Sequence, residues 1–555
     1  MQSNTSVLIV GGSLTGLTTA LLLARRRVPC MVVERHANTS VQYKFRGISP
    51  RSMEIYRSAG VEEEIRRCDP IDERSAYVAR MKNLADGEIS WQGIPWADTA
   101  SISPTTAGVC DQDLLEPILK RHAGQLGADV RFQTELVRFE QDKDGVIALI
   151  RRLDDGTEET VRAAYLVAAD GTHSAVRDAL GIARHGPGVL QHWMNVIFET
   201  DLQPTIDGRA IRSVFVTDIN GTFVPREGGR WLMAVQYVPE RGERAEDFTP
   251  NRCAELIRRG AGRNIKAEIV DVRSWEAAAL VADQYRQGRA FLVGDSAHVM
   301  PPTGGFGGNT GIQDAYNIAW KIDAVLQQSA GDTLLDTYDA ERRPVADRTM
   351  AQALARLQAW FKDPGKKLPP AEPIVDDYAV MFGYRYSSGA VISDGDDASR
   401  GAFFEDPRHP SGRPGSRAAH LVVEREGTRM STIDVFHDRW VLLAGRDGEA
   451  WRDVATRESR EHRLALACYQ LGPPGDLKDA ENRWASLFDV DPDGAVSSVP
   501  TASSLGELET PLEERRRRCM RPSTASRFAR RYADNPVVPR RLPSGHMFMT
   551  NVIAD

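Results

Sequence analysis

The sequence predicts an α/β protein: a doubly wound parallel sheet, interrupted by an antiparallel sheet and followed by a separate α/β module. Three observations predict this fold class. An apolar run, a glycine turn and a helical stretch open the chain at 6–34, two later apolar runs end in an acid beside a glycine at 165–171 and 290–295, and 184–275 alternates apolar with polar residues. Continuous apolar runs are typical of parallel strands buried on both faces, whereas alternation is typical of antiparallel strands with one solvated face.

The same patterns give the domain boundaries. We expect the parallel-sheet domain in two parts, 1–183 and 276–400, with the antiparallel sheet at 184–275 and the C-terminal module at 418–496. The tail 497–555 carries many arginines and no sustained hydrophobic periodicity. We therefore expect that tail to be poorly ordered.

Composition excludes several classes of function. The chain has 555 residues, 41% hydrophobic and 26% charged, and its net charge of -7 gives no basic field for nucleic acid or an anionic membrane. The six cysteines are scattered without a CxxC motif, so we expect no metal site, no disulfide framework and a cytoplasmic location. The first residues lack the pattern of a signal peptide, and we find no apolar run of about 18 residues that could span a bilayer.

The stretch GGSLTG, residues 11–16, matches G-x-G-x-x-G with serine at the middle glycine. Gly11 makes a tight turn, Ser13 lies where a pyrophosphate approaches, and Gly16 lets the following helix pack on the strand. Glu34, about 20 residues on and followed by Arg35, can accept hydrogen bonds from an adenosine ribose. The combination favours a dinucleotide site over an ordinary tight turn. Because serine adds only a hydroxymethyl group, we expect it to be tolerated, with slightly weaker phosphate packing.

A second buried run, YLVAADG, ends in Asp170 and Gly171 and leads into a helix. An acid at the carboxyl end of a strand, followed by glycine, permits a ligand to approach closely. The same acid can instead cap the helix, and the residues leave both interpretations open.

The stretch GDSAHVMPPTGGFGGN, residues 294–309, would disrupt a core helix or strand. Asp295 can bind a sugar-alcohol hydroxyl, and Pro302 stiffens the turn that follows. Glycines at 304, 305, 307 and 308 allow a flat ring to stack on bare backbone. The N–H groups that open the next helix, near Asn309, can stabilise negative charge on that ring. We interpret His298 as a structural, hydrogen-bonding histidine.

These three stretches together resemble the class A flavoprotein aromatic hydroxylases of the p-hydroxybenzoate hydroxylase fold, from residue 5 to about 496. The texts GISPRSMEIYRSAGV, CDQDLLEPIL and FGYRYSSGAV are most similar to the subgroup that hydroxylates polycyclic aromatic polyketides, such as tetracenomycin and anthracycline oxygenases. The resemblance implies non-covalent FAD, transient NADPH or NADH, and O2. It also implies a substrate-binding inserted sheet and a thioredoxin-like C-terminal domain.

Carried over by position, the resemblance implies a set of FAD-binding residues. They are Gly11, Ser13, Gly16, Glu34, Arg35, Lys44, Arg46, Gln112, Asp170, Gly171, Gly294, Asp295, Pro302, Gly305, Gly307, Gly308 and Asn309. Gln112 would reach the ribityl or flavin region. Lys44 occupies the position of the family's flavin-contacting arginine, and a lysine lacks the planar fork of a guanidinium. Tyr237, Arg385 and Pro302 are the candidates at the catalytic centre, the first two for contacting a substrate phenol.

The implied reaction is hydroxylation of a polycyclic aromatic polyketide in antibiotic biosynthesis, through reduction of FAD by NAD(P)H and a flavin C4a-hydroperoxide. Three alternatives stay open: a Baeyer–Villiger oxygenase on a polyketide, a hydroxylase of small phenols, and a non-catalytic flavin-binding partner. We expect a small aromatic substrate, no nucleic-acid or membrane partner, and a monomer or homodimer.

The tail carries a prediction of its own. Related chains continue GAV, residues 494–496, with text such as LVRPDGFVAWRA. When the first base of one permitted codon string for that text is deleted, the string reads SSVPTASSLGE, which is the sequence at 497–507. We therefore predict a single-base frameshift near Val496, which resequencing of the DNA decides.

Overall fold

We describe the fold from a computed structural model of the chain. It describes residues 2–41, 44–68, 76–92, 99–203, 205–206, 209–226, 229–360, 368, 370–391, 402–436, 440–461, 466–472, 475–488, 491–499 and 503–507. Within these residues, the helices are all too short or too polar to cross a membrane.

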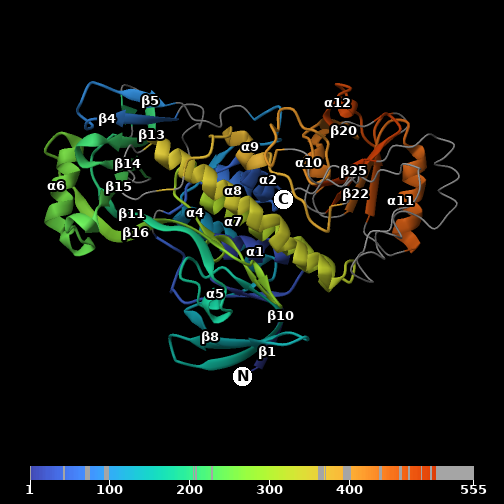
Figure 1. The fold of residues 1–555 in the computed structure, drawn as a ribbon, viewed down its shortest axis with the longest axis horizontal. Helices are drawn as coiled ribbons and strands as arrows, with labels where there is room; N and C mark the ends of the chain where they lie inside the picture. The colour runs from blue at the N-terminus through green and yellow to red at the C-terminus, as the bar shows by residue number, and fades with distance from the viewer. Residues whose placement is uncertain are drawn as a thin grey trace.

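The predicted parallel sheet is present, and its strands β1 and β10 lie in the lower part of Figure 1. Its parallel strands follow the order β18 (Ala290–Leu292), β10 (Glu158–Ala168), β1 (Gln2–Val10), β2 (Cys30–Glu34) and β7 (Asp129–Phe132). The antiparallel strands β17 (Arg286–Gln287), β9 (Val146–Arg152) and β8 (Thr134–Gln141) extend it. The apolar runs lie where the pattern predicts, because Val7, Leu8 and Ile9 are fully buried in β1.

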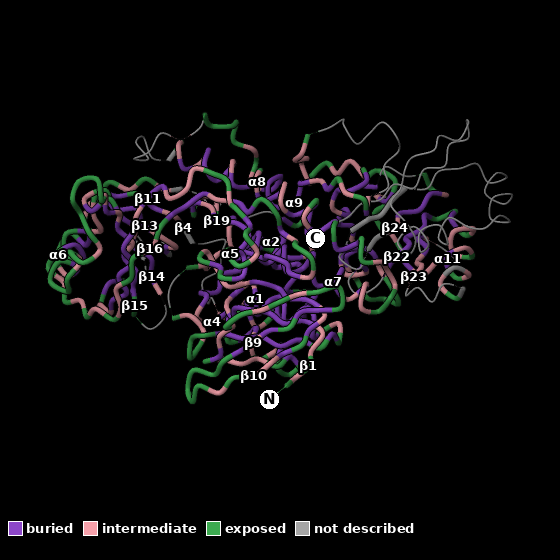
Figure 2. Tube along the Cα trace, turned by 60° about the horizontal axis from the view of Figure 1, so that its bottom comes forward, coloured by how far each residue is buried: buried purple, intermediate pink, exposed green. Residues whose placement is uncertain are grey.

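Helix α1 (Leu14–Arg25) packs on β1 and β2 of this sheet and against both α4 (Gln112–Gln125) and α7 (Phe306–Leu326), and α4 also packs on β7. Figure 2 shows buried residues gathered where α1, α2 (Pro50–Ser58) and α7 meet. The long helix α8 (Asp336–Trp360) crosses the molecule beside α7 (Figure 1). The shorter helices are α3 (Glu62–Arg66), α5 (Ala175–Ala179) and α9 (Asp377–Phe382), and β3 (Gly47–Ile48) pairs with β6 (Gly108–Val109) ahead of α4.

The second sheet is antiparallel, as predicted, except where β13 pairs with β4 in parallel. Its strands, in spatial order, are β19 (His298–Val299), β16 (Glu268–Ala282), β11 (Arg184–Glu199), β15 (Arg230–Tyr237), β14 (Gly221–Pro225), β13 (Arg209–Val216), β4 (Ala76–Met81) and β5 (Ser90–Gln92), with β12 (Thr205–Ile206) beside β13. Helix α6 (Pro250–Ala261) covers one face. The expected boundaries of 184–275 are therefore too narrow, because β16 runs on to Ala282 and residues 76–92 supply two more strands. Such long-range pairing leaves no local signal in the sequence.

The C-terminal module is an α/β unit with its own apolar core (Figure 1). Its main sheet follows the order β23 (Leu466–Gln470), β22 (Trp440–Ala444), β24 (Ala495–Val499) and β25 (Ser503–Glu507). The hairpin β20 (Val422–Arg425) and β21 (Thr428–Ser431) and the helices α10 (Thr432–Val435), α11 (Glu449–Glu461) and α12 (Trp484–Phe488) complete it.

The module is attached to the first domain by charged and aromatic contacts. Arg57 donates to Asp434 at 2.8 Å, and Arg417 donates to Glu54, which is buried in α2. Trp440 meets Trp320 of α7 edge to face, with ring centroids 6.2 Å apart. These contacts fix the module against the helices that also carry the candidate site.

The start of the tail departs from the prediction. Strand β24 crosses the expected boundary at Val496, and β25 pairs with it at 503–507. The expectation that residues from 497 onward would be unstructured is therefore wrong for these two strands. Pairing with β22 supplies backbone hydrogen bonds, which need no periodic apolar pattern. Residues 508–555 lie outside the described residues, and the frameshift stays a prediction.

Candidate functional site

The glycine turn after β1 is constrained by the protein itself. Gly11 has φ +107°, and a Cβ atom there would lie 2.2 Å from the carbonyl oxygen of Ala169. A Cβ atom on Gly16 would lie 1.9 Å from the carbonyl oxygen of Gly11. Both glycines are therefore required for β1, β10 and α1 to pack closely, and the first turn of α1 stays open to a ligand.

Glu34 lies at the end of β2, as predicted, and its carboxylate already has protein partners. It accepts hydrogen bonds from the backbone N–H of Gly12 at 2.7 Å and from that of His36 at 2.9 Å. The Nδ1 atom of His36 also lies 2.5 Å from Oε1. Oε2 is therefore the oxygen with a second lone pair, through which Glu34 can still accept a ribose hydroxyl. Arg35, beside it, is exposed.

Asp170 supports the start of α5, and its contact with a ligand stays a prediction. Its Oδ2 atom accepts from the N–H of Val176 at 3.1 Å, in the first turn of α5, while Ser174 caps that helix. Its Oδ1 atom is buried without a hydrogen-bond partner. Burial raises the pKa of this carboxyl above its usual value. One oxygen thus supports the helix, and the other is available to a ligand beside Gly171, whose φ is +81°.

Asp295 follows β18 and lies in the short 3-10 turn Gly294–Ser296. Its side chain is exposed to solvent, yet the surrounding protein raises its pKa by desolvation, an effect that His298 and Lys44 oppose. An accessible carboxylate with protein around it can accept hydrogen bonds from a bound polyol. Gly294, before it, has φ +59°, and a Cβ atom there would lie 2.5 Å from the hydroxyl of Thr15 in α1.

The glycines after Pro302 have different roles from one another. Gly304 and Gly305 have φ +90° and +67°, so the backbone conformation itself requires them. A Cβ atom on Gly308 would lie 2.4 Å from the ring of Phe45, whereas one on Gly307 would meet only Met300, at 3.5 Å. The expectation that all four glycines expose bare backbone is therefore wrong in part, because two serve the turn and one accommodates Phe45.

The surface at the start of α7 remains accessible. Pro302 and Gly305 are exposed, and Gly307 and Gly308 are half-buried. Asn309 fixes the neighbouring segment, because its side chain accepts from the N–H of Ser49 at 2.8 Å and donates to the carbonyl oxygen of Gly47 at 3.0 Å. The first N–H groups of α7 thus face an accessible surface with the dipole of a 21-residue helix behind them.

Lys44 and Arg46 lie on different sides of this surface. Lys44 is exposed, and its charge acts on Asp295. Arg46 instead reaches the second sheet, where it donates to the carbonyl oxygen of Pro225 at 2.8 Å. It also lies 3.6 Å from Asp111, to which Arg226 donates at 3.2 Å. Lys44 is therefore the cation near the predicted ligand, and Arg46 joins the two domains.

Sequence reasoning missed a buried charge network behind Asp295. Asp314 of α7 accepts from Arg342 at 2.8 Å, from the N–H of Gly294 at 3.1 Å, and pairs with His298 at 2.7 Å. Burial raises the pKa of Asp314, but His298 and Arg342 together hold it below its usual value. The structural interpretation of His298 agrees with this network. The signal in the sequence was a set of polar residues, Asp314 with Asn317 and Lys321, spaced along one face of α7 among apolar residues.

The candidate substrate contacts separate in space. Tyr237 lies in the core shared with α6, with its ring centroid 5.7 Å from that of Phe248 and 5.5 Å from that of His192. Figure 1 shows α6 on the far side of the sheet from α7. Because side chains alternate along a strand, the ring of Tyr237 points to the face of the second sheet that α6 covers. It therefore points away from the residues around Asp295.

Arg385 lies closer to the network. Its neighbour Tyr384 donates its hydroxyl to Gln313 of α7 at 3.3 Å, and Tyr386 accepts from Arg342 at 2.9 Å. Arg385 itself is half-buried, and its charge opposes the raised pKa that burial gives to Glu405. The segment that carries Arg385 is thus joined to the helix that begins at the glycines.

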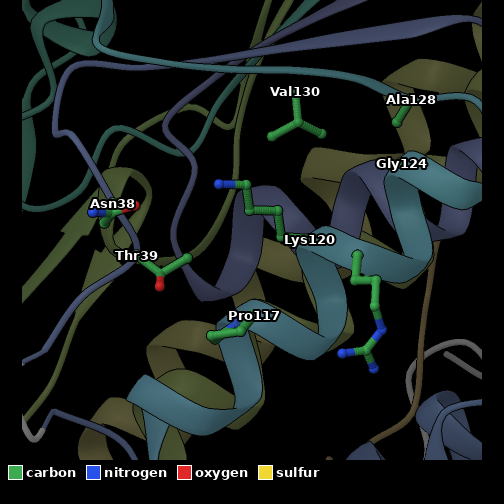
Figure 3. Close-up of a pocket in the computed structure, with 8 residues that line it drawn as sticks. Asn38, Thr39, Pro117, Lys120, Gly124, Ala128 and Val130 are labelled. Carbon is green, nitrogen blue, oxygen red and sulfur yellow. The ribbon is translucent and has the colours of Figure 1, made fainter.

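A separate open cavity of about 530 Å³ lies beside α4 (Figure 3). It is lined by Asn38, Thr39, Pro117, Lys120, Arg121, Gly124, Ala128 and Val130. Lys120 extends into it from α4. The cavity adjoins the segment after Arg35 and contains none of the predicted site residues.

The residues present fit FAD. The exposed carboxylate of Asp295, the unpartnered oxygen of Asp170 and the accessible start of α7 at Gly307 are groups that a ribityl chain, a pyrophosphate and a flavin ring could use in turn. Among the described residues, no group of three or more His, Cys, Asp and Glu side chains could hold a metal ion.

Comparison with known proteins gives matches along most of the chain. The FAD binding domain family matches residues 4–353. An aklavinone 12-hydroxylase of Streptomyces peucetius subsp. caesius is 44% identical over 474 residues, covering 83% of this chain and 95% of the relative. A 4-methyl-5-nitrocatechol 5-monooxygenase of Burkholderia sp is 39% identical over 514 residues, covering 89% and 92%. The solved ternary complex of aklavinone-11 hydroxylase with FAD and aklavinone matches with a TM-score of 0.85 and 38% identity, covering 91% and 95%.

Proposed function

This chain belongs to the FAD binding domain family, and from that premise we propose that it is an FAD-dependent, NAD(P)H-consuming monooxygenase that hydroxylates a polycyclic aromatic polyketide. The relatives agree with the resemblance to anthracycline hydroxylases seen in the sequence. The observation that carries the proposal is that the carboxylate of Asp295 and the start of α7 are both accessible. The carboxylate supports binding of ribityl hydroxyls, and the helix start supports binding of a ring that carries negative charge.

The chain's own residues would hold the cofactor in three places. The turn at Gly11–Gly16 and the first N–H groups of α1 would bind the pyrophosphate, beside the unpartnered oxygen of Asp170. Asp295 would accept hydrogen bonds from ribityl hydroxyls. The N–H groups of Gly307 and Gly308 would stabilise negative charge on the ring through the dipole of α7.

Bound FAD supplies the redox chemistry, taking a hydride from NAD(P)H and delivering one oxygen atom from O2 to the aromatic ring. The protein must keep water out of the reaction space and orient the substrate. The second sheet is joined to the first domain by Arg46 and Arg226, and so can form the roof of that space. Arg385 is our candidate for contacting a substrate phenolate, and Pro302, exposed at the mouth of the turn, would border the ring.

The purified protein with FAD and NADPH should consume oxygen when a tetracyclic aromatic polyketide such as aklavinone is added. We expect substrate to raise the rate of NADPH oxidation at least about tenfold, as specific binding organises the site. An oxygen electrode, with mass spectrometry of the product under ¹⁸O2, measures uptake and insertion together. Flavin binding without stimulated oxygen uptake across a panel of aromatics would instead indicate a non-catalytic binding partner.

A second candidate function is hydroxylation of a small phenol. The relative named as a nitrocatechol monooxygenase favours it, because that protein is nearly as similar to this chain as the aklavinone hydroxylase. The same oxygen-uptake panel separates the two when it includes single-ring catechols. Ring hydroxylation and Baeyer–Villiger insertion both add one oxygen atom and give products of the same mass, so NMR of the product distinguishes them.

We further propose that the C-terminal module is thioredoxin-like and acts as a scaffold. Its parallel pair β22 and β23, with α11 packed against both, is compatible with that fold. Cys468 lies in β23 without a second cysteine in a CxxC arrangement, and burial raises the pKa of its thiol to about 12. A thiol held protonated is a poor nucleophile. We also propose that the enzyme is cytoplasmic, because its six cysteines are scattered along the sequence without a CxxC motif, as in proteins of a reducing compartment.

A further inference from the structure

Three polar side chains form a closed cycle between the glycine turn and α4. Ser13 Oγ donates to Glu116 Oε1 at 2.5 Å, and Gln112 Nε2 donates both to Ser13 Oγ, at 3.0 Å, and to Glu116 Oε1, at 2.5 Å. Ser13 and Glu116 are 103 residues apart in the chain. The cycle therefore joins two of the predicted FAD-binding segments through a residue, Glu116, that no motif singled out.

The cycle fixes the orientation of the Gln112 amide. An ionised carboxylate can only accept, so the NH2 group of Gln112 must face Glu116 and its carbonyl oxygen must face the other way. Gln112 would therefore meet a ligand as an acceptor. The hydroxyl hydrogen of Ser13 is likewise committed to Glu116, so Ser13 does not donate to a phosphate.

Glu116 is fully buried and holds a third segment as well. Its Oε2 atom accepts from the backbone N–H of Ser40 at 2.8 Å, in the loop that follows β2. In the described part of the chain, its hydrogen-bond donors are thus an alcohol, an amide side chain and a backbone N–H. A buried carboxylate is costly unless its oxygens are satisfied, and here each of them has a donor. Replacing any one member leaves a buried group without its partner.

We propose that Glu116 is a positioning residue that sets the geometry of Ser13 and Gln112 for FAD, a role that rests on the proposed function. The sequence suggested that the serine in the glycine motif is merely tolerated. Under this proposal that serine has a specific role instead. It is the link through which α4 holds the pyrophosphate turn. The same link turns the carbonyl oxygen of Gln112 toward the ribityl or flavin region.

Titration of the apo-protein with FAD, followed by flavin fluorescence, tests this proposal in wild type, Glu116→Gln, Ser13→Ala and the double variant. We expect Glu116→Gln to weaken FAD binding at least about tenfold, because its NH2 group would face another donor. Ser13→Ala should weaken binding at least about fivefold. The double variant should bind FAD no more weakly than the single variant with the lower affinity. Both changes break the same cycle, so their effects should not add.

Lys120→Gln is the matched control, one turn further along α4 and pointing to the outer cavity, and should bind FAD as wild type does. Two results would overturn the positioning role. One is that the fold-losses of FAD affinity in Glu116→Gln and Ser13→Ala multiply in the double variant, and the other is that Ser13→Ala binds FAD within about twofold of wild type. Failure of wild type to bind FAD would instead overturn the proposed function. If Glu116→Gln does not fold, the pair Ser13→Ala and Gln112→Ala provides the same test of the cycle. The visible absorption band of bound flavin should shift in both variants, which a loss of general stability alone would not cause.

Discussion

Asp314→Ala is expected to lower the free energy of unfolding by about 3–5 kcal/mol, because it leaves the charge of Arg342 buried without its carboxylate and removes the hydrogen-bond partner of His298. All three side chains are fully buried, and Asp314 also accepts from the N–H of Gly294. Urea denaturation followed by circular dichroism measures the change. Because Gly294 precedes Asp295, we also expect the variant to lose affinity for FAD.

Asp323→Ala is the control on the same helix. Asp323 lies 3.5 Å from Arg26 and is partly exposed, so its loss should cost about 1 kcal/mol or less. Equal effects of the two substitutions would contradict the assignment of a buried network to Asp314. The comparison uses one residue type in one helix, so helix propensity cancels.

Gly16→Ala should lower the free energy of unfolding by about 3 kcal/mol and prevent α1 from docking at the end of β10. The added methyl group would lie 1.9 Å from the carbonyl oxygen of Gly11, a backbone atom that cannot move aside. The gain in helix propensity from alanine, about 1 kcal/mol, is too small to compensate. Thermal denaturation of the apo-protein measures the loss.

Gly124→Ala supplies the matched control for that change. Gly124 also lies inside a helix, α4, and a Cβ atom there would meet nothing within 4 Å. We therefore expect this variant to be more stable than wild type by about 0.5–1 kcal/mol. Opposite signs at the two glycines would identify the close approach of α1 as the cause. A stabilised Gly16→Ala would show that the turn is looser than described.

Local patterns predicted what local physics determines. The run at Val7–Ile9, the turn at Gly11 and the acid at Glu34 follow from burial, backbone conformation and the end of a strand, and the structure has them as predicted. The position of Asp295 just after the buried strand β18 likewise agrees with the apolar run that precedes it. Each of these features depends on residues that are close together in the chain.

Features built by contacts between distant segments were not predictable from the sequence. The partner of Ser13 is Glu116, and the partner of Asp314 is Arg342, and neither pair shares a motif. Strands β4 and β5 joined the second sheet through pairing with β13, which alternation could not reveal. Tyr237 lies in the core under α6, because its strand could be predicted but not the face to which its ring points. In each case the missing information was which segments meet in space.

The central claim is that FAD lies between Asp295 and the start of α7. Titration of the apo-protein with FAD, followed by the quenching of flavin fluorescence, tests it directly in wild type and in Asp295→Ala. We predict one tightly bound FAD per chain in wild type and at least about a hundredfold weaker binding in the variant, since a carboxylate that accepts two hydroxyls contributes about 3 kcal/mol. A wild-type protein that leaves FAD fluorescence unchanged, or an Asp295→Ala variant that binds as tightly as wild type, would contradict the account.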